Sequence, residues 1–222
     1  MTQTIEIITS EGMYPAPFTH RVLIMCHEKN IPYKLTTVNT YQKPDWFLAI
    51  APLGQVPVMR IDETVIFDSR AIWEYLELTF KPHLLPTDPI LCAKHRSWIA
   101  FADELAQEIA QFVKQKKILI RDLWRLNALL NILDTHLKGP FFFGETLSLV
   151  DITLISHLLW LDALEQRVLP CAMIYKFPKL VTWLNTMKSR DSLSKTMGPN
   201  YSDHFIALLK KHHLVAEWLP EE

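Results

Sequence analysis

The hydrophobic positions of residues 1–80 follow two different spacings. Short apolar runs predict strands over 6–9, 56–61 and 65–67, and a run of alternating type predicts another over 33–38. Apolar positions three and four residues apart predict helices over 19–29 and 69–80, with a short helical or irregular segment over 43–49. The predicted order is therefore β-α-β-α-β-β-α.

That order is typical of a thioredoxin-like α/β domain with a mixed four-stranded sheet, and we assign it to residues 1–80. Residues 81–90 contain three prolines and no hydrophobic period, which predicts a linker. Beyond them the spacing is helical throughout, so residues 91–222 are expected to form an all-helical domain. The predicted helices are 91–116, 118–137, 149–165, 179–189 and 201–212.

One helix start in the second half is marked by a capping pattern. Ser148-Leu149-Val150-Asp151 has the form S-x-x-D before an apolar run. Ser148 would cap the helix, and Asp151 would reach back to the Ser148 N–H. We interpret both residues as structural, and expect loss of the cap to cost about 1 kcal/mol of stability.

Composition narrows the class of protein. The 222 residues are 49% hydrophobic and 21% charged, with a net charge of −1, which indicates a globular chain with no overall attraction for nucleic acid. No apolar run reaches the ~18 residues of a membrane span, and the first six residues do not have the features of a signal peptide. The three cysteines are far apart, which fits a reducing compartment and no zinc site. We expect a cytoplasmic protein without metal, membrane or nucleic-acid partner.

Three segments carry candidate binding chemistry. Residues 15–21 lie between apolar runs, where a strand would turn into a helix whose free N–H groups favour an anion. Val56-Pro57-Val58 precedes a predicted strand, and Asp68-Ser69 precedes a predicted helix. An ordinary trans proline and a plain N-cap remain open as alternative interpretations of the last two segments.

Together with their neighbours, these segments resemble a cytosolic glutathione transferase, most closely bacterial members related to the omega and dehydroascorbate-reductase classes. The resemblance is carried by Lys43-Pro44-Asp45-Trp46-Phe47, by 52–58 (Pro-Leu-Gly-Gln-Val-Pro-Val), by Asp68-Ser69, and by 143–151 with its capping pattern. It implies a two-domain fold, a homodimer, glutathione as co-substrate and a small hydrophobic electrophile as second substrate.

The resemblance also implies where glutathione would bind. A cis Val56–Pro57 bond would turn the Val56 N–H and C=O outward, so that the tripeptide pairs there like an added strand. Lys43, which could equally be a solvated lysine, would reach the glycyl carboxylate, and Asp68 and Ser69 would hold the γ-glutamyl end. The Phe18 N–H would lie near the thiol. Arg21 is expected to brace the first helix and its loop.

The reactive cysteine of the cysteine-type relatives is missing. Their Cys-Pro-aromatic-x-x-Arg segment aligns with residues 16–21, which places Ala16 at the cysteine position. Alanine forms no thiolate, so thiol transfer and dehydroascorbate reduction are in doubt. The enzyme could instead activate glutathione's own thiol through the helix N-terminus or a nearby hydroxyl, with Tyr14 and Ser10 as candidates and Thr9 and Thr19 as further ones.

Ala16 is compatible with two alternatives besides an altered transferase. It could be an introduced substitution, or the protein could bind without catalysing, like the stringent starvation protein A family, which binds RNA polymerase. We favour transfer of glutathione to or from an electrophile. The second substrate would occupy an apolar pocket between the domains, for which the candidates are Phe101, Glu104 and Trp160, with Phe18 as a further one.

Overall fold

The computed structural model describes residues 4–11, 16–114, 120–169, 172–198 and 200–211. It divides into two compact units. The first comprises Met1–Leu84 together with Asp191–Gly198, and the second comprises Leu85–Arg190 together with Pro199–Glu222. The sequence pattern had placed 191–198 with the helical half.

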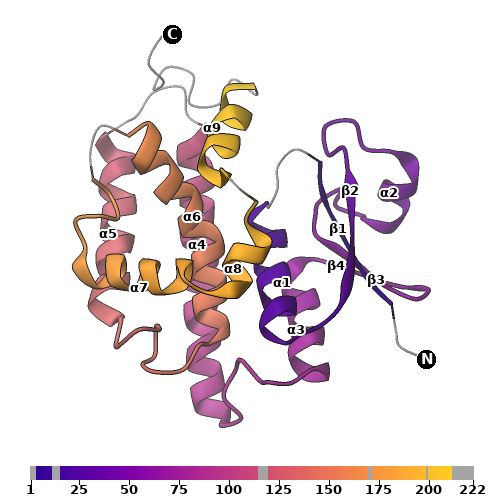
Figure 1. Ribbon diagram of the computed structural model, residues 1–222, viewed down its shortest axis with the longest axis horizontal. Helices are drawn as coiled ribbons and strands as arrows, with labels where there is room; N and C mark the ends of the chain where they lie inside the picture. Colours follow the sequence, from indigo (N-terminus) through magenta and orange to yellow (C-terminus); the bar gives the residue numbers. More distant parts are fainter. Residues whose placement is uncertain (1–3, 12–15, 115–119, 170–171, 199, 212–222) are drawn as a thin grey trace. The chain divides into compact units, whose positions relative to one another are not determined.

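The first unit is built on a four-stranded mixed sheet with the order β2-β1-β3-β4 (Figure 1). β1 (Ile5–Ser10) runs parallel to β2 (Tyr33–Val38) and antiparallel to β3 (Val58–Ile61), which pairs antiparallel with β4 (Thr64–Phe67). This confirms the thioredoxin-like sheet. The prediction of a strand from residue 56 was wrong, because β3 begins only after Pro57, which has no N–H to donate to a ladder.

Helices cover both faces of this sheet. α1 (Pro17–Glu28) and α3 (Ser69–Thr79) lie together on one side and α2 (Asp45–Ile50) on the other (Figure 1). Under α2, Phe47 packs with Ile8 and Val58 in a fully buried apolar cluster. Because β1 is central, its isoleucines on both faces are buried.

A helix that the sequence pattern did not predict completes the first unit. α8 (Asp191–Thr196) packs against α1. Ser192 Oγ donates to Glu28 Oε1 at 2.5 Å, and His20 Nε2 lies 2.9 Å from Thr196 Oγ1. Six residues are too few for a 3.6-residue period to be recognised, so this helix has no clear sequence signal.

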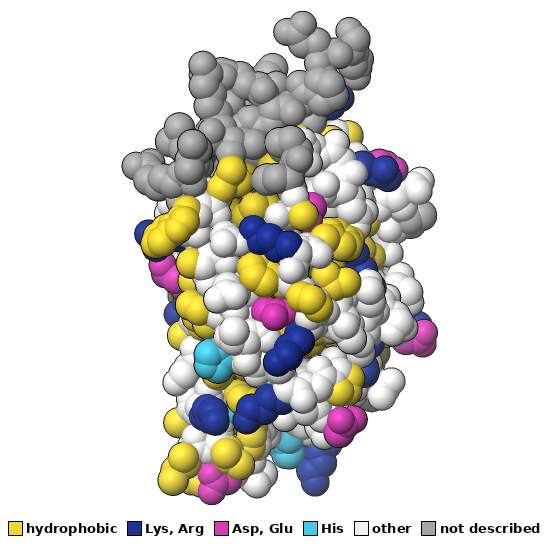
Figure 2. Space-filling view, turned by 90° about the vertical axis from the view of Figure 1, so that its left-hand side faces the viewer, with side chains coloured by type: hydrophobic (Ala, Val, Ile, Leu, Met, Phe, Trp, Pro, Cys, Tyr) yellow, Lys and Arg dark blue, Asp and Glu magenta, His cyan; other side chains and the backbone are white. Residues whose placement is uncertain are grey.

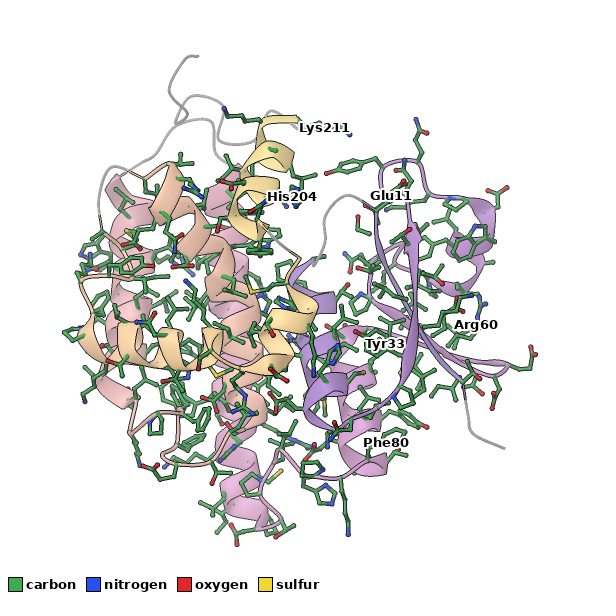
Figure 3. The ribbon with its side chains drawn as sticks, in the orientation of Figure 1. Glu11, Tyr33, Arg60, Phe80, His204 and Lys211 are labelled. Atoms are coloured by element: carbon green, nitrogen blue, oxygen red, sulfur yellow. The ribbon has the colours of Figure 1, made fainter. Side chains whose placement is uncertain are left out.

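A buried ion pair and its hydrogen bonds hold the segment that follows α3 in the first unit. Lys29 Nζ lies 2.8 Å from Glu77 Oε2 and donates to the carbonyl oxygens of Phe80 (labelled in Figure 3) and Pro82 at 2.7 and 2.6 Å. Glu77 Oε1 in turn accepts the Leu84 N–H at 2.7 Å. The first residues of the predicted linker are therefore held in place by the side chains of Lys29, at the C-terminal end of α1, and of Glu77 in α3.

The second unit is helical, as predicted. Its central helix α6 is buried over most of its length and contacts α4, α7 and α9, while α5 packs on α4 and α7. α4 begins at Pro89, inside the predicted linker, because proline is favoured in the first helical turn. The bounds are α4 Pro89–Lys114, α5 Ile120–His136, α6 Leu149–Arg167, α7 Pro178–Lys188 and α9 Tyr201–Lys211.

Asp151 does more than the capping pattern implied. Its carboxylate accepts the Ser148 N–H at 2.9 Å and the Ser148 O–H at 2.7 Å. It also accepts the Phe142 N–H at 2.6 Å and the Trp183 indole N–H at 2.8 Å. Burial raises the pKa of Asp151, and these hydrogen bonds oppose the rise.

The face of the second unit seen in Figure 2 carries hydrophobic side chains scattered among basic and acidic ones. Trp124 of α5 is among the exposed hydrophobic residues of this unit. In the part of the chain that the structure describes, no helix combines the length and the apolar character needed to cross a membrane.

Candidate functional site

A cavity of about 270 Å³ lies in the first unit, bordered by three segments. One is the start of α1, the second is the loop before β3, and the third is the junction between β4 and α3. The lining residues are Phe18, Arg21, Ala51, Leu53, Gln55, Val56, Pro57, Phe67, Asp68, Ser69 and Arg70. Of the glutathione-binding residues expected from the sequence, five line the cavity: Phe18, Val56, Pro57, Asp68 and Ser69.

The loop before β3 turns at Gly54, which has a φ of +58°. Its N–H donates to the Ala51 carbonyl at 2.7 Å. A Cβ added at Gly54 would lie 3.0 Å from Lys43 Nζ. Glycine is favoured here because the backbone is left-handed, and any larger residue would also shift the end of the exposed Lys43 side chain. Lys43 is exposed and borders this loop without lining the cavity.

Val56 presents an open stretch of backbone to the cavity. The Val56–Pro57 bond is cis. Within the described residues, neither the N–H nor the C=O of Val56 takes part in a hydrogen bond. Backbone groups are strong donors and acceptors, so an extended peptide in the cavity could pair with Val56 as an added strand.

The start of α3 leaves hydrogen-bond donors available at the cavity. Asp68 is the N-cap, with a φ of 72°, and its Oδ1 accepts the N–H groups of Arg70 and Ala71 at 2.7 and 3.4 Å. The N–H and the hydroxyl proton of Ser69 are the donors at this helix start that have no partner among the described residues. Together with the positive end of the helix dipole they favour a carboxylate.

Arg21 lines the cavity, although the sequence predicts only that it braces the first helix and its loop. Its side chain is buried, lines the cavity and donates from Nη2 to Ser69 Oγ at 2.6 Å. The guanidinium also lies over the Phe18 ring, 5.1 Å from its centroid. Arg21 and Ser69 are 48 residues apart in sequence, and no local pattern on α1 indicates which residue of α3 it meets.

Ala16, at the expected cysteine position, is the N-cap residue of α1. Its carbonyl accepts the His20 N–H at 2.7 Å, and Pro17 occupies the first helical turn. Ala16 is buried and is not one of the residues lining the cavity. Its methyl group can neither ionise nor attack a substrate.

The hydroxyl candidates near Ala16 differ in their surroundings. Tyr14 lies outside the described residues. Ser10 is buried at the end of β1, its Oγ is 2.8 Å from Thr40 Oγ1, and it does not line the cavity. The following residue Glu11, labelled in Figure 3, continues the pairing by donating its N–H to Val38 at 2.8 Å.

Two more hydroxyls, those of Thr9 and Thr19, are buried without a hydrogen-bond partner among the described residues. Neither residue lines the cavity. They are therefore shielded from a ligand bound in the cavity as it stands.

Three residues expected to help form a second-substrate pocket, Phe101, Glu104 and Trp160, lie in the second unit. Each has a neighbour there, and none lines the cavity of the first unit. Phe101 packs on Trp98 with ring centroids 5.2 Å apart, Glu104 pairs with Arg125 at 3.0 Å, and Trp160 packs on Phe205 at 4.8 Å. Their role toward a second substrate stays a prediction.

Burial disfavours ionisation of Cys26 and His20 on α1. It raises the pKa of the Cys26 thiol to about 12, so Cys26 is a thiol at neutral pH. It lowers the pKa of His20 to about 3, so this imidazole is neutral. Across the described residues, His, Cys, Asp and Glu side chains form no group that could hold a metal ion.

Comparison with known proteins finds relatives of both parts of the chain. The model of the glutathione S-transferase N-terminal domain matches residues 16–79, and that of the C-terminal domain matches residues 89–191. Glutathione S-transferase DHAR2 of Arabidopsis thaliana is 30% identical over 203 residues, covering 91% of this chain and 88% of that protein. The probable chloroplastic glutathione S-transferase DHAR2 of Oryza sativa subsp. japonica is 29% identical over 184 residues, which are 82% of this chain and 65% of that protein.

A solved structure shows the same likeness across both units. Glutathione transferase Omega 3C from Trametes versicolor superposes with a TM-score of 0.79 at 25% identity, covering 96% of this chain and 93% of that one. The chain therefore belongs to the glutathione S-transferase family and is related to its plant DHAR and omega-class members.

Proposed function

We propose that the protein binds glutathione in the cavity of the first unit. The observation that carries this proposal is that the unpaired backbone of Val56 and the unpaired donors of Ser69 border one cavity of the described structure. The cysteinyl part of the tripeptide would pair with the Val56 N–H and C=O. The γ-glutamyl carboxylate would accept from Ser69, its ammonium group would donate to Asp68, and Lys43 would reach the glycyl carboxylate.

We further propose that the bound thiol reacts directly with a small hydrophobic electrophile. Ala16 stands where cysteine-type relatives carry their nucleophile, so the nucleophile has to be glutathione's own sulfur. The positive end of α1, including the Phe18 N–H, would lower the pKa of that thiol. The thiolate then forms a carbon–sulfur bond while the leaving group departs with the bonding electrons. A homodimeric cytoplasmic transferase is the form we expect.

A second candidate is a protein with this fold that binds a ligand or partner without catalysis, as in the stringent starvation protein A family. Two observations favour it. Ala16 has no ionisable group, and the Ser10 hydroxyl is already bonded to Thr40. The two candidates agree on the cavity and differ on turnover.

Binding is tested by thermal unfolding with added glutathione. A ligand at 100 times its Kd stabilises the native state by about 2.7 kcal/mol, so we expect a clear rise in Tm. Ser69→Ala should reduce that rise, whereas Ser97→Ala should leave it unchanged, because the Ser97 hydroxyl is exposed and bonds only its own helix. Absence of any rise at millimolar glutathione would contradict the binding proposal.

Turnover is tested with 1-chloro-2,4-dinitrobenzene as acceptor. Conjugation by the wild-type protein supports the transferase, whereas glutathione binding without conjugation of this or related electrophiles supports the non-catalytic candidate. Ala16→Cys tests the alignment separately. It should create exchange with glutathione disulfide, because a thiol at this helix start has a lowered pKa. A folded variant without that exchange would show that residue 16 is not the cysteine position.

A further inference from the structure

Arg21 and Ser69 form a contact between α1 and α3 at the anion-binding end of the cavity. Both side chains are buried and both residues line the cavity. The bond from Arg21 Nη2 to Ser69 Oγ is 2.6 Å long. The guanidinium carbon also lies over the Phe18 ring, 5.1 Å from its centroid, a cation–π contact that favours this orientation.

The chemistry of the two groups fixes the direction of this bond. A guanidinium has donors only, so Ser69 Oγ has to accept. A hydroxyl has a single proton, which this contact leaves available for a second partner. No described residue takes that proton, and Asp68 Oδ1 accepts the N–H groups of Arg70 and Ala71.

We propose that Arg21 is a positioning residue that turns Ser69 into a dedicated donor for a ligand carboxylate. With one lone pair of Ser69 Oγ filled by Arg21, the hydroxyl proton is directed to the cavity beside the Ser69 N–H. A donor that itself accepts from a cation is also polarised and donates more strongly. Arg21 thereby selects a carboxylate at this end of the site. The inference rests on the proposed binding of glutathione.

The test is a set of affinities measured by calorimetry. The variants are Arg21→Met, Ser69→Ala and the double variant, and the ligands are glutathione, 4-aminobutyryl-Cys-Gly and glutaryl-Cys-Gly. The first analogue lacks only the α-carboxylate of the glutamyl residue, and the second lacks only its ammonium group. Circular dichroism and Tm establish that each variant is folded.

The expected pattern depends on the carboxylate. Arg21→Met should raise the Kd for glutathione and for glutaryl-Cys-Gly by about tenfold or more, which corresponds to the usual strength of a hydrogen bond to a charged group. The same substitution should change the Kd for 4-aminobutyryl-Cys-Gly by less than about twofold. In the Ser69→Ala background it should change the Kd for glutathione equally little. Equal losses of affinity for all three ligands would overturn the inference. So would an undiminished effect of Arg21→Met on glutathione affinity in the Ser69→Ala background.

The wild-type protein supplies a readout that does not depend on a buried substitution. In a crystal structure with glutathione, Ser69 Oγ should lie within hydrogen-bond distance of both Arg21 Nη2 and the glutamyl carboxylate. A structure in which Arg21 contacts the carboxylate itself, or in which Ser69 Oγ faces away from it, would overturn the inference. Failure of the wild-type protein to bind glutathione would instead refute the proposed function.

Discussion

Replacement of Asp151 by alanine should destabilise the protein far more than loss of a helix cap. The carboxylate accepts four hydrogen bonds from three residues, at 2.6 to 2.9 Å. Asp151 is completely buried, so solvent cannot replace it. The substitution leaves three buried N–H donors without partners, those of Phe142, Ser148 and Trp183. The Ser148 hydroxyl can turn to another acceptor.

The magnitude follows from those three donors. An unsatisfied buried donor costs about 1–3 kcal/mol, so three of them cost at least about 3 kcal/mol. Burial of the Asp151 carboxylate is itself unfavourable and raises its pKa, and the alanine variant avoids this cost. The net loss of stability should therefore lie near the lower end of the range for three unsatisfied donors. Ser148→Ala removes only the hydroxyl bond and should cost about 1 kcal/mol.

The assay is urea unfolding followed by circular dichroism, with Trp183 contributing a fluorescence signal from within the affected contact. Asp151→Ala should lower the free energy of unfolding by at least about 3 kcal/mol relative to wild type, and by about 2 kcal/mol more than Ser148→Ala. Equal losses in the two variants would show that Asp151 acts only as a cap, and would refute the assignment of its bonds to Phe142 and Trp183.

The remaining predictions concern α1 and the loop before β3. Because burial lowers the pKa of His20 to about 3, the unfolded chain binds a proton that the folded chain does not, and this part of the stability is lost as the pH falls from 6.5 toward 3. Wild type should lose about 1.4 kcal/mol per pH unit more than His20→Gln across that window, and parallel stability curves would contradict this. Gly54→Ala should cost about 1–2 kcal/mol through its left-handed backbone and weaken glutathione binding by displacing Lys43. Gly198→Ala is the control, since a Cβ there meets open space, and equal effects would refute the role of Gly54.

The parts of the fold that local sequence determines were predictable. Short apolar runs and one alternating run indicated the strands of the first unit, and the 3.6-residue period indicated nearly all the helices, because each element buries a recognisable set of apolar positions. α8 was missed because six residues are too short to show a period. α4 begins earlier than predicted because Pro89 stands in a proline-rich stretch without a hydrophobic period, although proline fits a first helical turn.

The site was predictable where a motif describes it. Val56, Asp68 and Ser69 lie in short motifs and line the cavity. Arg21 was not recognised as part of that wall, because its contact with Ser69 joins helices distant in sequence. The same limit applies to Asp151, whose cap is local but whose bond to Trp183 spans 32 residues. Contacts of this kind depend on how the helices pack, which no local pattern encodes.

The central claim is that glutathione pairs with the open backbone of Val56 and the start of α3. Amide hydrogen exchange, measured residue by residue by NMR with and without glutathione, tests it most directly. Saturating glutathione should slow exchange at the Val56 and Ser69 amides, whose N–H groups have no partner among the described residues of the free protein. Unchanged exchange at both amides, while glutathione protects amides elsewhere, would contradict the claim.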